Sequence, residues 1–260
     1  MLAGIVALML RSGAGDLDVL ARTLLGGAHA GRPFSAFWFV SVLFCTMVFA
    51  RIVDRFPIVA QCGLAGVGLV AISWQPGLLA HTPLGIGLAP GYLTFVLFGR
   101  WLRRSDGVWP ARPTSTALAG AALMVAGSVV VALGWSAPLD LKQGDLGTPV
   151  VGVVVAAALT AGPVLVAVAA RGLVRGRIAA AATTLAGAGI CAVLAHPGVL
   201  FVLRTPESGR VMDLALALVL PWLLGVLALR TPLSGWVNGV ERRPSGPAAR
   251  RSARHRHAIG

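Results

Sequence analysis

Seven long apolar runs, separated by short connections rich in arginine, constrain this chain more than any other feature. Each run has about 20 residues, the length at which an α-helix crosses the roughly 30 Å hydrocarbon layer of a bilayer. Of the 260 residues, 57% are hydrophobic and 12% are charged, whereas soluble domains carry about 25% charged residues. The pattern predicts an all-α integral membrane protein with spans at 34–53, 58–79, 83–100, 115–136, 149–170, 180–203 and 211–230.

The two ends of the chain differ from these runs. Residues 2–10 form an eighth apolar run of about half the length of a span, which predicts a partial N-terminal helix. Residues 231–260 are rich in arginine, proline and alanine and show no apolar periodicity, which predicts a disordered tail held near anionic lipid. We therefore expect a transmembrane domain over 1–230, followed by a basic cytoplasmic tail over 231–260.

The distribution of basic residues predicts how the runs are oriented. Connections on alternate sides of the predicted membrane hold sixteen and six of the 22 arginine and lysine residues. Cytoplasmic loops carry the excess of positive charge in membrane proteins, so the side with sixteen is expected to be cytoplasmic. This orientation places both termini in the cytoplasm of a multi-pass protein of the inner (plasma) membrane. It also explains the net charge of +13 without nucleic acid, which we do not expect as a partner.

Small residues at helical spacing predict seams where helix backbones approach closely. A glycine-rich stretch, GIGLAPG at 85–91, lies on the outer side at the start of a predicted span and predicts a turn. The expected seams are formed by Gly63, Gly66 and Gly68, and by Ala119, Ala122 and Ala126.

The sequence lacks the signatures of several common enzyme classes. It contains no P-loop, no glycine-rich dinucleotide turn, no HExxH and no GxSxG, so we expect neither a metal site nor a bound cofactor. A transporter driven by protons or sodium places acids near the membrane midplane. The only acid within a span is Asp213, which lies near an outer end and beside Arg210, so a surface pair is expected there. His196 is then the one deep ionisable side chain.

Three stretches carry a resemblance to a known family: FSAFWFVSVLFCTMVF, GYLTFVLFGRWLRR and LAGAGICAVLAHPGVLF. Together they resemble the membrane-bound acyltransferase family 3, in particular its fucose 4-O-acetylase-like branch. FSAFWFVSVLFCTMVF (34–49) is similar to a span of that branch that contains Trp-Phe-Leu and Leu-Phe. GYLTFVLFGRWLRR (91–104) is similar to its span that ends in a Leu-Leu-Arg-Arg sequence. LAGAGICAVLAHPGVLF (185–201) is similar to a late segment with a His-Pro pair, where this chain has His196 and Pro197. The resemblance covers most of residues 1–230.

The resemblance implies a ten-helix membrane enzyme. Such an enzyme transfers an acyl group, usually acetyl, from cytoplasmic acetyl-coenzyme A to a hydroxyl of an extracytoplasmic carbohydrate. Membrane lipid and a carbohydrate acceptor would then be the partners of this chain. The sequence alone indicates no oligomeric state.

The chain departs from the family in its catalytic signature. The family has a basic residue, ten further residues and then a histidine in its first helix, where the histidine acts as a general base. No histidine of this chain has a basic residue eleven positions before it, so the catalytic residues are unknown. The short run at Met1 corresponds to the end of the family's third helix, and we expect the chain to be truncated before it. This departure predicts that the chain alone is inactive.

His196 and Trp38 remain as candidates for the substrate cavity. Both residues lie in stretches that carry the resemblance. A histidine within a membrane can bond to a substrate, and the proline behind it can kink the helix. The alternative for His196 is a structural role between helices. The alternative for the whole chain is a non-enzymatic membrane protein, either a small transporter or a subunit of a membrane complex.

Overall fold

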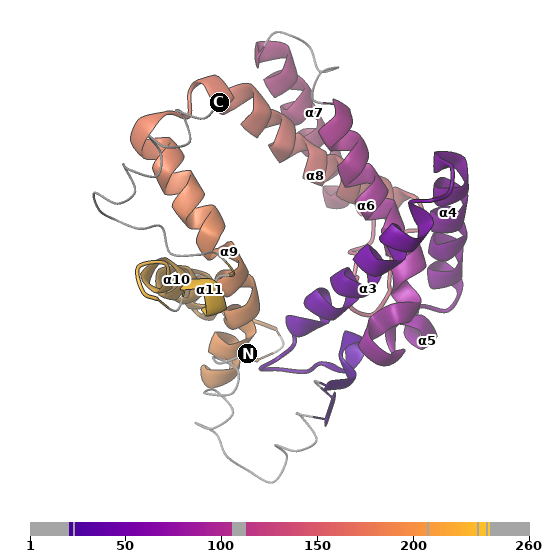
Figure 1. The fold of residues 1–260 in the computed structure, drawn as a ribbon, viewed down its shortest axis with the longest axis horizontal. Helices are drawn as coiled ribbons and strands as arrows, with labels where there is room; N and C mark the ends of the chain where they lie inside the picture. The colour runs from indigo at the N-terminus through magenta and orange to yellow at the C-terminus, as the bar shows by residue number, and fades with distance from the viewer. Residues whose placement is uncertain are drawn as a thin grey trace, which may run out of the picture.

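The computed structural model describes residues 21–22, 24–105, 113–206, 208–232, 234–237 and 239. Within these residues the fold is all-helical and has no strand, as the sequence predicts. The larger helices, shown in Figure 1, are α3 (Phe37–Val53), α4 (Ile58–Trp74), α6 (Ala89–Arg104), α7 (Pro113–Ala132), α8 (Val151–Ala169), α9 (Gly176–Val202) and α10 (Val211–Ala228). The short ones are η1 (Gly27–His29), α5 (Pro76–Ala80), η2 (Pro83–Leu88), η4 (Ala170–Gly172) and α11 (Ser234–Val237).

Each predicted span contains one of the larger helices, but the helices are not equally long. Within the described residues, α7, α9, α10 and α8 with its extension to Gly172 are long and apolar enough to cross a membrane. The helices α3 and α4 are apolar but have 17 residues each. The predicted span 83–100 is divided between η2 and α6, and within η2 Leu84 and Gly85 adopt positive φ angles of 58° and 68°. Of the glycine-rich stretch 85–91, only Gly85 has such an angle, and residues from Ala89 onward belong to α6.

Glycines set the closest approaches between helices. A Cβ built at Gly68 of α4 would lie 2.3 Å from the backbone nitrogen of Gly91 in α6. In the same way, a Cβ at Gly120 of α7 would lie 2.6 Å from the carbonyl oxygen of Gly162 in α8. Gly225 of α10 lies against α9 with similar closeness. Since no other residue fits at these distances, the helix pairs α4–α6, α7–α8 and α9–α10 depend on glycine.

The predicted seams are correct at one position only. Gly68 forms the contact between α4 and α6, but Cβ atoms built at Gly63 and Gly66 would meet nothing within 4 Å. The prediction that alanines form the seam on α7 is wrong, because α7 packs on α8 with a different face. That face carries Gly120 and Gly127, which are buried. The exposed alanines are Ala119, Ala122 and Ala126.

Contacts between distant segments group several helix ends together. At the end that we call inner, Arg103 of α6 and Arg171 of η4 line one cavity of about 240 Å³. At the opposite, outer end, the Nζ of Lys142 donates to the carbonyl oxygen of Ala30 at 2.6 Å. There too, Nη1 of Arg32 donates to the carbonyl oxygen of Thr205 at 2.8 Å. Residues far apart in the chain thus meet at each of these two ends.

The helices form an open arc, not a closed bundle (Figure 1). The helices α3, α4 and α6 occupy one arm, α7 and α8 continue it, and the α9–α10 pair forms the other arm. Only 17% to 28% of each of the four long apolar segments is buried within the described chain. Most of their apolar surface therefore faces lipid or other helices.

The predicted partial helix at 2–10 and almost all of the predicted tail lie outside the described residues. From 231 onward the structure describes only residues 231–232, 234–237 and 239.

Candidate functional site

His196 lies on α9 directly before Pro197, and its ring bonds to its own helix. The ring nitrogen Nδ1 is 2.8 Å from the carbonyl oxygen of Val193. Proline has no amide hydrogen, so Pro197 cannot make the helical bond to the residue four positions earlier, which is Val193. The imidazole therefore supplies the donor that the proline removes, and the His-Pro pair has a local structural function within the helix.

This bond also fixes the tautomer of a neutral His196 ring. A carbonyl oxygen only accepts hydrogen bonds, so the proton must lie on Nδ1 and the lone pair on Nε2. The side chain is half-buried. An imidazole held in this way presents Nε2 as an acceptor, which suits a bond from a hydroxyl group of a ligand.

A cavity of about 490 Å³ lies at the outer end of α9. The segment before α3 contributes Arg32 to its lining, and Arg204 is exposed at its edge. The bond from Arg32 to the carbonyl oxygen of Thr205 joins these two parts of the chain. Arginine side chains offer several donors in a fixed plane, so the cavity suits a ligand rich in oxygen atoms. Its lining residues are Arg32, Leu200, Phe201, Arg204 and Thr205.

His196 lies deeper in the membrane domain than this cavity, on the same side of α9. Residues four apart share one face of an α-helix. His196 and Leu200 are spaced in this way, and Leu200 lines the cavity, whereas Arg204 lies beyond the end of α9 at Val202. The histidine is therefore one helical turn below the cavity lining.

The second candidate, Trp38, belongs to a different pocket. It lies near the start of α3 and lines an apolar pocket of about 250 Å³ with Tyr92 of α6 and Leu141. The hydroxyl of Tyr92 donates to the carbonyl oxygen of Leu141. Trp38 packs against the buried cluster that contains Val42 and Tyr92. Among the described residues, the structure does not bring Trp38 and His196 into one site.

Sequence reasoning missed most of the cavity at the outer end. The sequence presents Arg32 and Arg204 only as charges in outer loops, and nothing in their spacing indicates that they meet. Asp213 was expected to pair with Arg210, but its Oδ2 accepts from the hydroxyl of Thr205 at 2.8 Å. This bond ties the start of α10 to the cavity lining. Only the three-dimensional packing brings these segments together, because they are distant in sequence.

A pair of histidines on the outer side was also missed. Nε2 of His29 bonds to the carbonyl oxygen of His81 at 2.9 Å. The two rings meet edge to face with their centroids 5.0 Å apart. Nδ1 of His81 bonds to the carbonyl oxygen of Gly77 at 2.7 Å. These contacts connect η1 to the segment after α5, so the pair fastens the outer loops to each other.

Within the described residues, no group of three or more histidine, cysteine or acidic side chains is placed to hold a metal ion. Comparisons with known proteins gave no matching family model, no matching curated protein and no matching solved structure. Any assignment of function therefore depends on the quoted sequence stretches and on the geometry of the site.

Proposed function

We propose that this chain is a seven-span, acyltransferase-like protein of the plasma membrane that takes part in O-acylation of an extracytoplasmic carbohydrate. The observation that carries the proposal is the position of His196. Its ring is held in the tautomer that leaves Nε2 as an acceptor, one turn below a cavity with two arginines. The three sequence stretches that resemble the acyltransferase family supply the class of reaction.

In this proposal the outer cavity receives the carbohydrate. Arg32 and Arg204 donate to its oxygen atoms, and Nε2 of His196 accepts from one of its hydroxyl groups. The acyl donor would be acetyl-coenzyme A from the cytoplasm. His196 is given no role as the catalytic base, because the sequence around it does not match the family's catalytic motif.

We further propose that catalysis requires helices in addition to those described. The long apolar helices bury at most 28% of their spans within this chain, and His196 is only half-buried. Acyl transfer from a thioester needs a site that excludes water. The open arc would acquire such a site when further helices close it.

A second candidate is a non-enzymatic subunit of a membrane complex. The same open arc favours it, because a subunit also leaves apolar faces for its partners. The two candidates differ in the function of the outer cavity, which only the acyltransferase proposal gives to a carbohydrate.

The test is acetyl transfer in membranes that contain the chain, with a mannose- or fucose-based glycan as acceptor. His196→Ala is expected to raise the acceptor KM about five- to tenfold, the loss of one hydrogen bond, and to leave the KM for acetyl-coenzyme A unchanged. His81→Ala, a histidine on the same outer side but away from the cavity, is the matched control and should change neither constant. Equal effects of both substitutions, or no acetyl transfer that depends on the chain, would favour the subunit.

A further inference from the structure

Another cavity at the inner end of the molecule is lined mainly by charged side chains. Its volume is about 720 Å³, and it lies where α3, α4 and α6 end or begin. Four arginines and one carboxylate line it, which gives a net of three positive charges. The charged lining residues are Arg51, Asp54, Arg100, Arg103 and Arg104.

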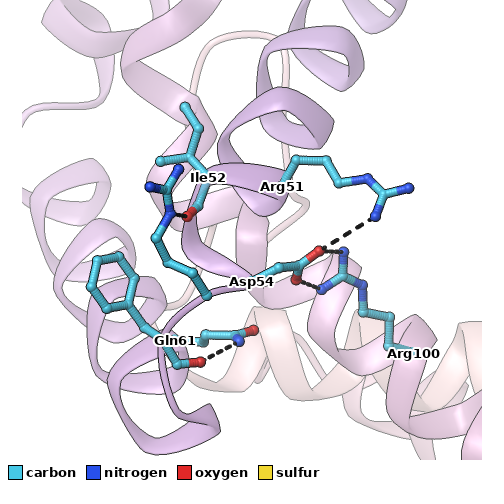
Figure 2. Close-up of polar contacts among 7 residues, drawn as sticks. Arg51, Ile52, Asp54, Gln61 and Arg100 are labelled. Carbon is cyan, nitrogen blue, oxygen red and sulfur yellow. Dashed lines mark hydrogen bonds and ion pairs between the residues drawn. The ribbon is translucent and has the colours of Figure 1, made fainter.

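The single carboxylate of this lining, that of Asp54, forms an ion pair within the chain. Arg100 donates to both carboxylate oxygens of Asp54 through its two terminal nitrogens (Figure 2). Nη1 of Arg51 lies 4.0 Å from Oδ2 of the same carboxylate. The bond from Arg100 and the charges of the nearby arginines lower the pKa of Asp54, so it is ionised at neutral pH. Asp54 thus pairs with Arg100 and Arg51 and leaves Arg103 and Arg104 of the cavity lining without a bonded carboxylate among the described residues.

Arg103 and Arg104 at the end of α6 are exposed. Among the described residues, no carboxylate bonds to either of them. Both are at the C-terminal end of a helix, where the helix dipole holds a cation in place without neutralising it. Their guanidinium groups are therefore available to an anion from outside the chain.

Apart from Gln61, whose Nε2 donates to the carbonyl oxygen of Phe56, the rest of the lining is apolar. Ile58 and Leu97 contribute to its walls, and Trp101 at its edge is 55% exposed. Tryptophan rings in this position lie at the level of lipid headgroups. A ligand that fits must therefore combine an anionic group with an apolar part.

We propose that this inner arginine cavity binds the phosphate headgroup of an anionic phospholipid of the cytoplasmic leaflet. Guanidinium groups bind phosphate oxygens in pairs, and basic pockets between membrane helices on the cytoplasmic side bind such headgroups. The acyl chains of the lipid lie along the apolar helices below. The inference depends on the proposed orientation of the helices and is independent of acyl transfer.

The experiment measures lipid retention by the full chain in nanodiscs of phosphatidylcholine with a minor fraction of phosphatidylglycerol. The test variant is Arg103→Gln with Arg104→Gln. The matched control is Arg55→Gln with Arg175→Gln, which removes the same charge from the same end. Arg55 bonds to the carbonyl oxygen of Ile52, and neither control residue lines the cavity. Native mass spectrometry counts the phosphatidylglycerol that remains bound.

We expect the test variant to bind phosphatidylglycerol about tenfold more weakly than the control variant, because only the test variant removes guanidinium groups that can bond directly to a phosphate in the cavity. An equal loss of bound phosphatidylglycerol in both variants would overturn the proposal, because it would show that the lipid responds only to the total charge of the chain. Inorganic pyrophosphate is the second probe. If the chain retains pyrophosphate but binds phosphatidylglycerol no better than phosphatidylcholine, the proposal is also overturned, because the cavity would then bind a soluble anion. Circular dichroism verifies folding, and Arg103→Gln alone replaces the double variant if that fails to fold.

Discussion

The Nδ1 atom of His196 lies 2.8 Å from the carbonyl oxygen of Val193, the one carbonyl that Pro197 deprives of its helical donor. A histidine and a proline side by side in an apolar helix thus compensate each other. The proline removes one hydrogen bond from the helix, and the histidine replaces it. The same bond leaves the opposite ring nitrogen to a ligand, so the structural and the functional interpretation of His196 are compatible.

This relationship predicts that the effects of His196→Ala and Pro197→Ala on stability are not additive. His196→Ala alone should lower the free energy of unfolding by about 1 kcal/mol, since it leaves a carbonyl unsatisfied. In the Pro197→Ala background the cost should vanish, because the alanine introduced there supplies the missing amide hydrogen. A double-mutant cycle of unfolding in mixed micelles measures this coupling. Pro163→Ala, in α8, is the control background and should leave the cost of His196→Ala unchanged. An equal cost of His196→Ala in the wild type, in Pro197→Ala and in Pro163→Ala would contradict the account.

The close approach of α4 and α6 predicts that two glycines of one helix respond differently to the same substitution. Gly68→Ala should destabilise the protein by about 1–3 kcal/mol, because its Cβ would collide with the backbone at Gly91. Gly63→Ala, on the open face of α4, should be neutral or stabilise by about 0.5 kcal/mol. Thermal unfolding in detergent compares the two. If Gly63→Ala proved the more harmful, the face of α4 that packs on α6 would have to be reassigned.

These two cases show what the sequence could predict. The apolar runs depend on local composition, so the segments that form helices were predictable. The face with which each helix packs was not predictable, because α4 and α7 carry small residues on several of their faces. Gly120 packs on α8 whereas Ala119, its neighbour, is exposed. Likewise, His196 was recognisable from its surroundings, but the meeting of Arg32 with Thr205 requires the packed structure.

The orientation of the helices predicts where reporters and reagents reach the chain. A reporter fused after Arg104 should be cytoplasmic, and one in the 137–148 loop should be external. Lys142 is the only lysine of the chain. An amine reagent that cannot cross membranes should therefore modify Lys142 in intact cells, and Lys142→Gln should abolish that labelling. Modification of Lys142 only after cell lysis would show that the orientation is the opposite of the one assigned.

Lys142 also predicts a pH dependence. Burial lowers its pKa, with the charge of Asp140 as a smaller opposing effect. The labelling rate of the folded protein should therefore rise at lower pH than that of the urea-unfolded chain. By linkage, stability should increase with pH between the folded and the unfolded pKa, because the unfolded chain binds the proton more tightly in that range. Labelling rates across the alkaline range measure both midpoints, and a folded midpoint at or above the unfolded one would contradict the assignment.

The most direct test of the central claim is to measure acetyl transfer from acetyl-coenzyme A to an envelope glycan in three samples. These are the purified chain, native membranes that contain the chain, and native membranes that lack it. The account predicts no transfer by purified residues 1–260, because the open arc excludes no water. It also predicts loss of transfer from membranes that lack the chain, restoration by the wild type, and weaker acceptor use after restoration with His196→Ala. Full transfer by membranes without the chain, or turnover by the purified chain alone, would contradict it.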